Sequence, residues 1–123
     1  MKPDIKNRED IIKLVDAFYL KIKTDKKIGY FFNDVAHVNW EKHLPIMYDF
    51  WENILFSTGN FSGNPMEKHQ QLHQKSTMTQ SHFTQWIKVF HETVDDLFQG
   101  AKAEEIKLRA VNIATAMMYK TLG

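Results

Sequence analysis

The chain has 123 residues, a length that suits one domain spanning residues 1–123, and it contains no cysteine. The lack of cysteine excludes a disulfide framework, thiolate metal sites and cysteine nucleophiles. Sixteen basic and fifteen acidic residues are interspersed and leave a net charge of +1, so nothing indicates a nucleic-acid partner. No stretch approaches the roughly 20 apolar residues that span a bilayer. We therefore expect a cytoplasmic protein with no membrane partner.

The spacing of apolar residues is helical nearly throughout, and no strand pattern or hairpin turn is found. Asn7 is expected to cap the first helix, which ends near Thr24-Asp25, and residues 28–32 then form an apolar corner. Along this helix the apolar positions follow steps of four, three and four, at Ile11, Val15, Phe18 and Ile22.

A second helix is predicted from about Asn39 to Phe56, and Pro45 is its difficulty. A proline inside a helix costs about 3 kcal/mol and removes a hydrogen bond, but it is tolerated in the first turn. An alternative start near Leu44 therefore stays open, and it would put His43 at the entrance of the helix or at a kink.

A short third helix is predicted to begin at Pro65, after the loop of residues 57–64. It carries His69 on the same face as Met66, with Leu72 or His73 one turn further on. Residues 74–80 are polar and are expected to form a linker.

The fourth helix is expected to be capped by Ser81 and ended by Gly100, and a fifth helix covers about Lys102 to Leu122. Five helical segments with short loops describe a compact all-α domain.

His69 follows a Gly- and Asn-rich turn, and aromatic residues are 13% of the chain. A haem iron needs one axial nitrogen ligand, commonly a neutral imidazole, and a dry pocket around the macrocycle. His69 fits that need, although a lone histidine is more often structural than metal-bound. Two rival metal sites stay open. His69 and His73 are four apart and could bind one ion from a single helix face. His37 and Glu41 could belong to a di-iron site, which has weak support because no paired Glu-x-x-His motif exists.

Three polar aromatic residues could act on the opposite side of such a haem, namely Tyr19, His43 and Trp86. Bound dioxygen carries partial negative charge, so a phenol O–H or an indole N–H would donate a hydrogen bond worth about 1.5–3 kcal/mol. Singly, Tyr19 and Trp86 are equally well explained as core residues with a satisfied polar tip. Motifs of serine hydrolases, phosphate loops and nucleotide-binding folds are absent.

Several sequence blocks occur together in an order and spacing that resemble the truncated haemoglobins, in particular their third group, over nearly the whole length. The blocks are Phe18-Tyr19, Ile28-Gly29-Tyr30-Phe31-Phe32-Asn33, Trp40-Glu41-Lys42-His43-Leu44-Pro45, Met47-Tyr48-Asp49-Phe50-Trp51, Gly63-Asn64-Pro65-Met66-Glu67-Lys68-His69, His82-Phe83-Thr84-Gln85-Trp86 and Arg109-Ala110. The two-glycine motifs of the other truncated groups are not evident, which agrees with the third group.

The resemblance implies a truncated globin fold, a two-over-two helical sandwich around haem b. It implies that His69 is the proximal iron ligand, that Tyr19 and His43 are the distal tyrosine and histidine, and that Trp86 overhangs the iron. The haem itself is expected to be contacted by Phe32, Met47, Phe50 and Phe83, with His73 near its edge or propionates.

The expected function is binding of dioxygen, nitric oxide or carbon monoxide at a five-coordinate iron, for oxygen chemistry or defence against nitrosative or peroxide stress rather than bulk transport. As an enzyme it would be a haem oxidoreductase, like a nitric oxide dioxygenase or a peroxidase, served by an external reductase. We expect a monomer. Two alternatives are a haem-based sensor or interaction module without turnover, and a helical bundle without cofactor.

Overall fold

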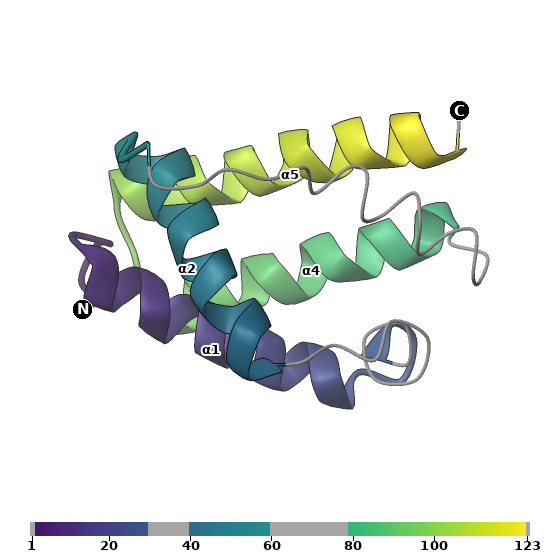
Figure 1. Cartoon of the computed structure of the whole chain (residues 1–123), viewed down its shortest axis with the longest axis horizontal. Helices are drawn as coiled ribbons and strands as arrows, with labels where there is room; N and C mark the ends of the chain where they lie inside the picture. Colours follow the sequence, from purple (N-terminus) through teal and green to yellow (C-terminus); the bar gives the residue numbers. More distant parts are fainter. Residues whose placement is uncertain (1, 30–39, 60–78, 123) are drawn as a thin grey trace.

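The structure, a computed structural model, describes residues 2–29, 40–59 and 79–122, with side chains described up to Met118. Within these ranges the secondary structure is entirely helical. The helices are α1 (Arg8–Thr24), α2 (Trp40–Phe56), α4 (Gln80–Leu97) and α5 (Ala101–Leu122), as labelled in Figure 1. The predicted short helix that begins at Pro65 lies outside the described residues.

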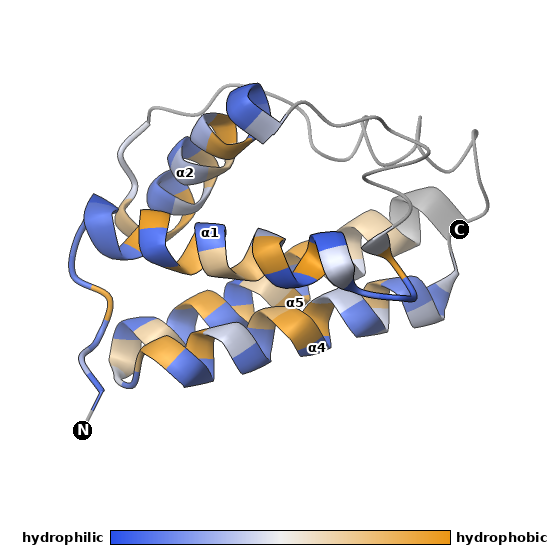
Figure 2. Ribbon diagram, turned by 90° about the horizontal axis from the view of Figure 1, so that it is seen from below, coloured by the Kyte–Doolittle hydropathy of each residue, from blue (hydrophilic) through white to orange (hydrophobic). Residues whose placement is uncertain are grey.

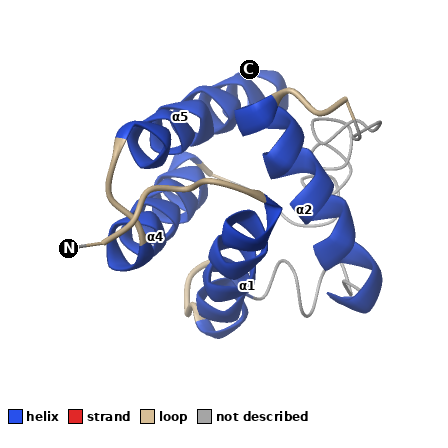
Figure 3. Cartoon of the chain, turned by 90° about the vertical axis from the view of Figure 1, so that its left-hand side faces the viewer, coloured by secondary structure: helices blue, strands red, loops and turns tan. Residues whose placement is uncertain are grey.

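The four helices form two layers, each of two helices. α4 and α5 run antiparallel and side by side, and α1 and α2 pack on each other to form the second layer (Figure 1). Between the layers α1 contacts α4 and α2 contacts α5, so the contacts close into a ring, which the end-on view in Figure 3 makes visible. This arrangement confirms the predicted two-over-two sandwich.

α1 begins and ends where its sequence predicts. The side chain of Asn7 accepts a hydrogen bond from the backbone N–H of Asp10 at 3.0 Å, which satisfies one of the donors left open at a helix start. After Thr24 the chain turns closely enough that a Cβ on Gly29 would lie 2.8 Å from the carbonyl oxygen of Ile22. The core face of α1 consists of Ile11, Leu14, Val15, Phe18, Tyr19 and Ile22.

α2 runs without interruption from Trp40 through Pro45, so the alternative start near Leu44 is wrong. In an α-helix the missing N–H of Pro45 would have bonded to the carbonyl of residue 41, which lies in the first turn. The helix therefore lacks this one backbone bond near its start and continues beyond it to Phe56. As a result, His43 lies inside the first turn of a regular helix.

α4 begins at Gln80, and the predicted cap at Ser81 is wrong because Thr79 occupies the N-cap. The backbone N–H of Thr79 donates to Nδ1 of His82 at 2.9 Å, and a histidine takes the part that a glutamate usually plays in a capping box. The helix ends at Leu97, before the predicted stop at Gly100. The apolar residues along α1, α4 and α5 alternate with hydrophilic ones, as amphipathic helices require (Figure 2).

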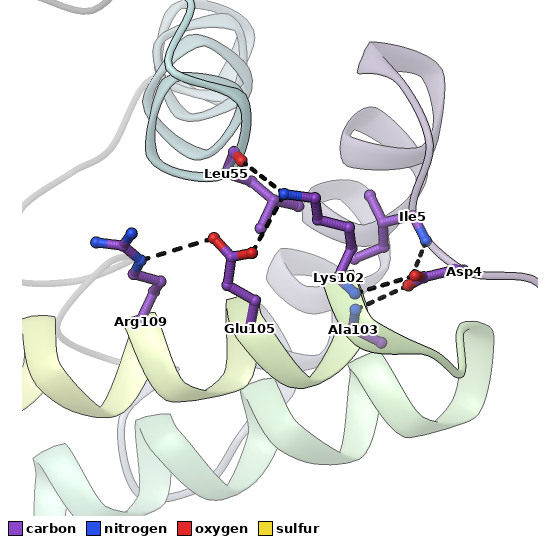
Figure 4. Close-up of polar contacts among 7 residues, drawn as sticks. All are labelled: Asp4, Ile5, Leu55, Lys102, Ala103, Glu105 and Arg109. Atoms are coloured by element: carbon purple, nitrogen blue, oxygen red, sulfur yellow. Dashed lines mark hydrogen bonds and ion pairs between the residues drawn. The ribbon is translucent and has the colours of Figure 1, made fainter.

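The amino-terminal segment is tied to the start of α5 through Asp4 (Figure 4). The carboxylate of Asp4 accepts hydrogen bonds from the backbone N–H groups of Lys102 at 3.0 Å and Ala103 at 2.9 Å. Gly100 has a φ of +146°, and a Cβ there would lie 2.5 Å from Cγ of Asp4, so only glycine allows this approach. Lys102 in turn reaches the carbonyl of Leu55 at the end of α2, at 3.5 Å.

Among the described residues, no helix has both the length and the apolar character needed to cross a membrane.

Candidate functional site

Two of the predicted distal residues meet where α1 and α2 cross. The ring of Tyr19 on α1 and the imidazole of His43 on α2 have centroids 5.4 Å apart, in an edge-to-face arrangement. Trp40, one helical turn before His43, completes a triangle, with centroids 5.3 Å from Tyr19 and 5.7 Å from His43. We call these three side chains the distal triangle. Residues more than 20 positions apart in sequence thus share one site.

Tyr19 is buried, with 5% of its surface exposed, although its hydroxyl is polar. Burial raises the pKa of this phenol well above its ordinary value near 10, since the phenolate would lose its hydration. The hydroxyl therefore keeps its proton at neutral pH and can donate a hydrogen bond. The Nε2 atom of His43 is likewise shielded from solvent inside the protein.

Trp86 lies on α4 and belongs to a second group of rings, the aromatic stack. It packs nearly parallel to Phe90, with centroids 5.6 Å apart and planes at 10°, and Trp51 of α2 stacks on Phe90 at 4.8 Å. Phe18 of α1 joins this stack to the distal triangle, because its ring meets Trp86 at 5.5 Å and Tyr19 at 4.9 Å. The two predicted hydrogen-bond donors, Tyr19 and Trp86, are therefore neighbours of the same phenylalanine.

The predicted apolar contacts of the haem are placed as follows. Phe50 and Phe83 are buried, and Met47 is half-buried against the core. Phe50 meets Trp51 edge-on at 5.1 Å. His69, Phe32 and His73 lie outside the described residues, as does His37 of the di-iron alternative, so their roles stay predictions.

Trp40 and Trp51 were not predicted to belong to the site, although both lie in the ring clusters. A signal for Trp51 is present in the sequence, because His43, Met47 and Trp51 follow at steps of four and must share one face of a helix. Trp40 lies three residues before His43 on the same face.

His82 lies next to Phe83, where α4 begins, and is half-buried. Burial lowers the pKa of His82, and the positive charge of Lys27 lowers it further. His82 is thus favoured in its neutral form, in which Nδ1 can accept the hydrogen bond from Thr79.

The helical sandwich and its ring-lined crossing have the form of a small globin. The family model described as "Bacterial-like globin" matches residues 4–120. The group 3 truncated haemoglobin ctb of Campylobacter jejuni is 32% identical over 129 residues, which cover 100% of this chain and 99% of that protein. A crystal structure of the group III truncated haemoglobin from Campylobacter jejuni superposes with a TM-score of 0.83 at 30% identity, covering 97% of this chain and 94% of that one.

The chain belongs to the bacterial-like globins and, among them, to the truncated haemoglobins of the third group. This confirms the resemblance and the fold class predicted from the sequence. Globins bind haem through its iron, in the usual form haem b, and bind small ligands there. The described residues fit that cofactor, because rings of α1 and α2 flank a buried phenol and a buried imidazole nitrogen, and Phe18 joins them to Trp86 of α4. A flat apolar macrocycle with a polar ligand needs such walls.

Proposed function

We propose that the protein binds haem b through His69 and uses a polar distal pocket to hold dioxygen and related diatomic ligands in the cytoplasm. When bound, the haem would supply a five-coordinate ferrous iron, with His69 in one axial position and the other open to a ligand. Phe32, Met47, Phe50 and Phe83 would form apolar walls, and His73 would lie near the haem edge or propionates.

The observation that carries this proposal is the buried Tyr19 in edge contact with His43. A phenol that keeps its proton inside an apolar site is a donor without competing water, and a donor to a partly negative ligand makes a hydrogen bond worth about 1.5–3 kcal/mol. Trp86 would be a second donor through its indole N–H. His43, in the first turn of α2, would control access to the ligand.

Such a pocket favours retention of the ligand over rapid exchange. Two donors of this strength would slow dioxygen release by roughly 10²–10⁴-fold, since about 1.4 kcal/mol corresponds to a factor of ten. Bulk transport needs quick release, so we propose oxygen chemistry or defence against nitric oxide or peroxide instead. Any such turnover consumes electrons, which an external reductase would supply to a monomeric protein.

The axial ligand is tested by the visible absorption spectrum. Purified wild-type protein, or protein supplied with hemin, should show a strong Soret band. His69→Ala should lose that band or shift it, while the matched variant His73→Ala should keep it, because only His69 is proposed to bind the iron. A folded wild-type protein that stays colourless with hemin would refute the proposal. Loss of the band in His73→Ala alone would show that His73, and not His69, binds the iron.

A further inference from the structure

Trp40 is the least expected member of the distal triangle, because it is the first residue of α2 and only half-buried. Its indole is nonetheless within ring contact of both polar residues, at 5.3 Å from Tyr19 and 5.7 Å from His43. The ammonium group of Lys23 also lies over this indole, 4.5 Å from the centre of the ring. Trp40 therefore connects a charged surface group to both distal residues.

Helix geometry explains why these four residues meet. Tyr19 and Lys23 are four positions apart on α1, and Trp40 and His43 are three apart on α2, so each pair shares one helix face. The crossing of the helices lays one pair over the other. A cation over an indole face is attracted by the ring quadrupole, and edge-to-face rings attract one another beyond their burial alone.

We propose that Trp40, held by Lys23, is a positioning residue that fixes the rings of Tyr19 and His43 and so sets how fast ligands enter and leave the pocket. This proposal rests on the proposed function, in which His43 controls access. For His43 to turn outward, its ring must give up its edge contacts with Tyr19 and Trp40. Lys23 opposes that movement indirectly, because it keeps the indole in place.

This role has a kinetic signature that differs from that of a hydrogen-bond donor. A donor such as Tyr19 stabilises the bound ligand and chiefly slows its release. A group that restrains the entrance raises the barrier in both directions, so removing it speeds entry and release together and changes the affinity less than either rate. The two roles are therefore separable in one set of measurements.

The test uses the ferrous haem protein with carbon monoxide as the probe. Association is followed after flash photolysis, and release by displacement with nitric oxide. Trp40→Phe should speed both rates by roughly two- to ten-fold, the equivalent of one aromatic pair. Lys23→Gln should speed both by roughly two- to five-fold, and Lys23→Arg should restore the wild-type rates, because arginine also stacks on an indole.

A structural readout accompanies the rates. In nuclear Overhauser spectra of the carbon monoxide form, the wild-type indole of Trp40 should show contacts to the ring protons of Tyr19 and His43, and Lys23→Gln should weaken them. Lys13→Gln is the matched control, since it removes a charge from an exposed position of the same helix, and it should change neither the rates nor the contacts.

Unchanged rates in both Trp40→Phe and Lys23→Gln, in proteins whose urea unfolding midpoints equal the wild type, would overturn the inference. Faster release with unchanged association would also overturn it, because that pattern belongs to a donor. Failure of the proposed function has a different outcome, namely a wild-type protein that does not take up haem or does not bind carbon monoxide.

Discussion

The two halves of α1 are held to the rest of the molecule by different forces. Around its first turn the contacts are polar and directional, with Arg8 bonded to Asp49 at 2.8 Å and to Glu52 at 2.7 Å on α2. Just before that turn, Asp4 binds the start of α5. The second half is held mainly by rings, from Phe18 onward, beside an ion pair of Lys21 with Asp96 at 2.7 Å.

The difference separates contacts that fix the helix ends from the region that we propose as the ligand site. Hydrogen bonds at helix ends fix geometry and satisfy backbone groups. Ring contacts hold side chains through their faces and edges, and here they enclose the buried Tyr19 among the rings of Phe18, Trp40 and His43. A pocket for a small ligand is therefore better built in the second half of the helix.

Removing the central ring of the second half should give the largest effect. Phe18 is fully buried and contacts Tyr19, Trp86 and Phe90, so Phe18→Ala should lower the free energy of unfolding by about 3–5 kcal/mol, as large-to-small changes in cores do. Equilibrium urea unfolding measures this loss. The control Leu20→Ala, at a side chain that is 66% exposed, should stay within about 0.5 kcal/mol of the wild type. Similar losses of unfolding free energy in Phe18→Ala and Leu20→Ala would show that the ring of Phe18 has no special part in holding this half of α1.

Removing only the polar tip should change ligand release and spare the packing. Tyr19→Phe keeps the rings in contact but deletes the donor, so dioxygen release should become roughly 10–100-fold faster, equivalent to about 1.5–3 kcal/mol. Stopped-flow spectroscopy measures the rate, and Trp86→Phe reports on the second proposed donor. Tyr48→Phe is the matched control, because the hydroxyl of Tyr48 donates to Asp16 at an exposed position and should leave release unchanged. If neither Tyr19→Phe nor Trp86→Phe speeds release, the donors have been misassigned.

The smallest effect is expected at Asp4, among the polar contacts just before α1. Asp4→Ala removes the acceptor of the first N–H groups of α5 and should cost about 1 kcal/mol in unfolding free energy, the typical value of a helix cap. Asp4→Asn should keep part of this stability, because an amide oxygen still accepts one bond.

The same residue gives a dependence on pH with a defined sign. Burial works to raise the pKa of Asp4, but the N–H groups of Lys102, Ala103 and Ile5 outweigh it and lower the pKa below the ordinary value. The stabilisation is therefore complete above the unfolded pKa, near 3.9, and is lost as the pH falls through the lower folded value. In Asp4→Asn this loss of stability at acid pH should disappear. If the free energy of unfolding of the variant depends on acid pH as that of the wild type does, Asp4 is not its source.

Local patterns predicted the helices well where one physical signal was sufficient. The cap at Asn7 and the end of the first helix near Thr24-Asp25 were predicted correctly, because both depend on residues close in sequence. The start of α2 and the cap of α4 were harder, because two local signals competed. At Pro45 the penalty for proline was weighed without knowing that the helix begins at Trp40, and at Ser81 a common capping residue concealed the pairing of Thr79 with His82.

The sequence by itself determined that the chain is helical, which faces of its helices are apolar, and, through the order of its blocks, that it belongs among the truncated haemoglobins. The first two properties follow from the spacing of apolar residues, because an α-helix repeats every 3.6 residues. The third rests on the resemblance of those blocks to the family. Only the tertiary structure decided that Trp40 completes the triangle with Tyr19 and His43, and that Phe18 joins it to Trp86. Helix periodicity fixes the face on which a side chain lies, but the point where two helices cross is set by the packing of their whole surfaces.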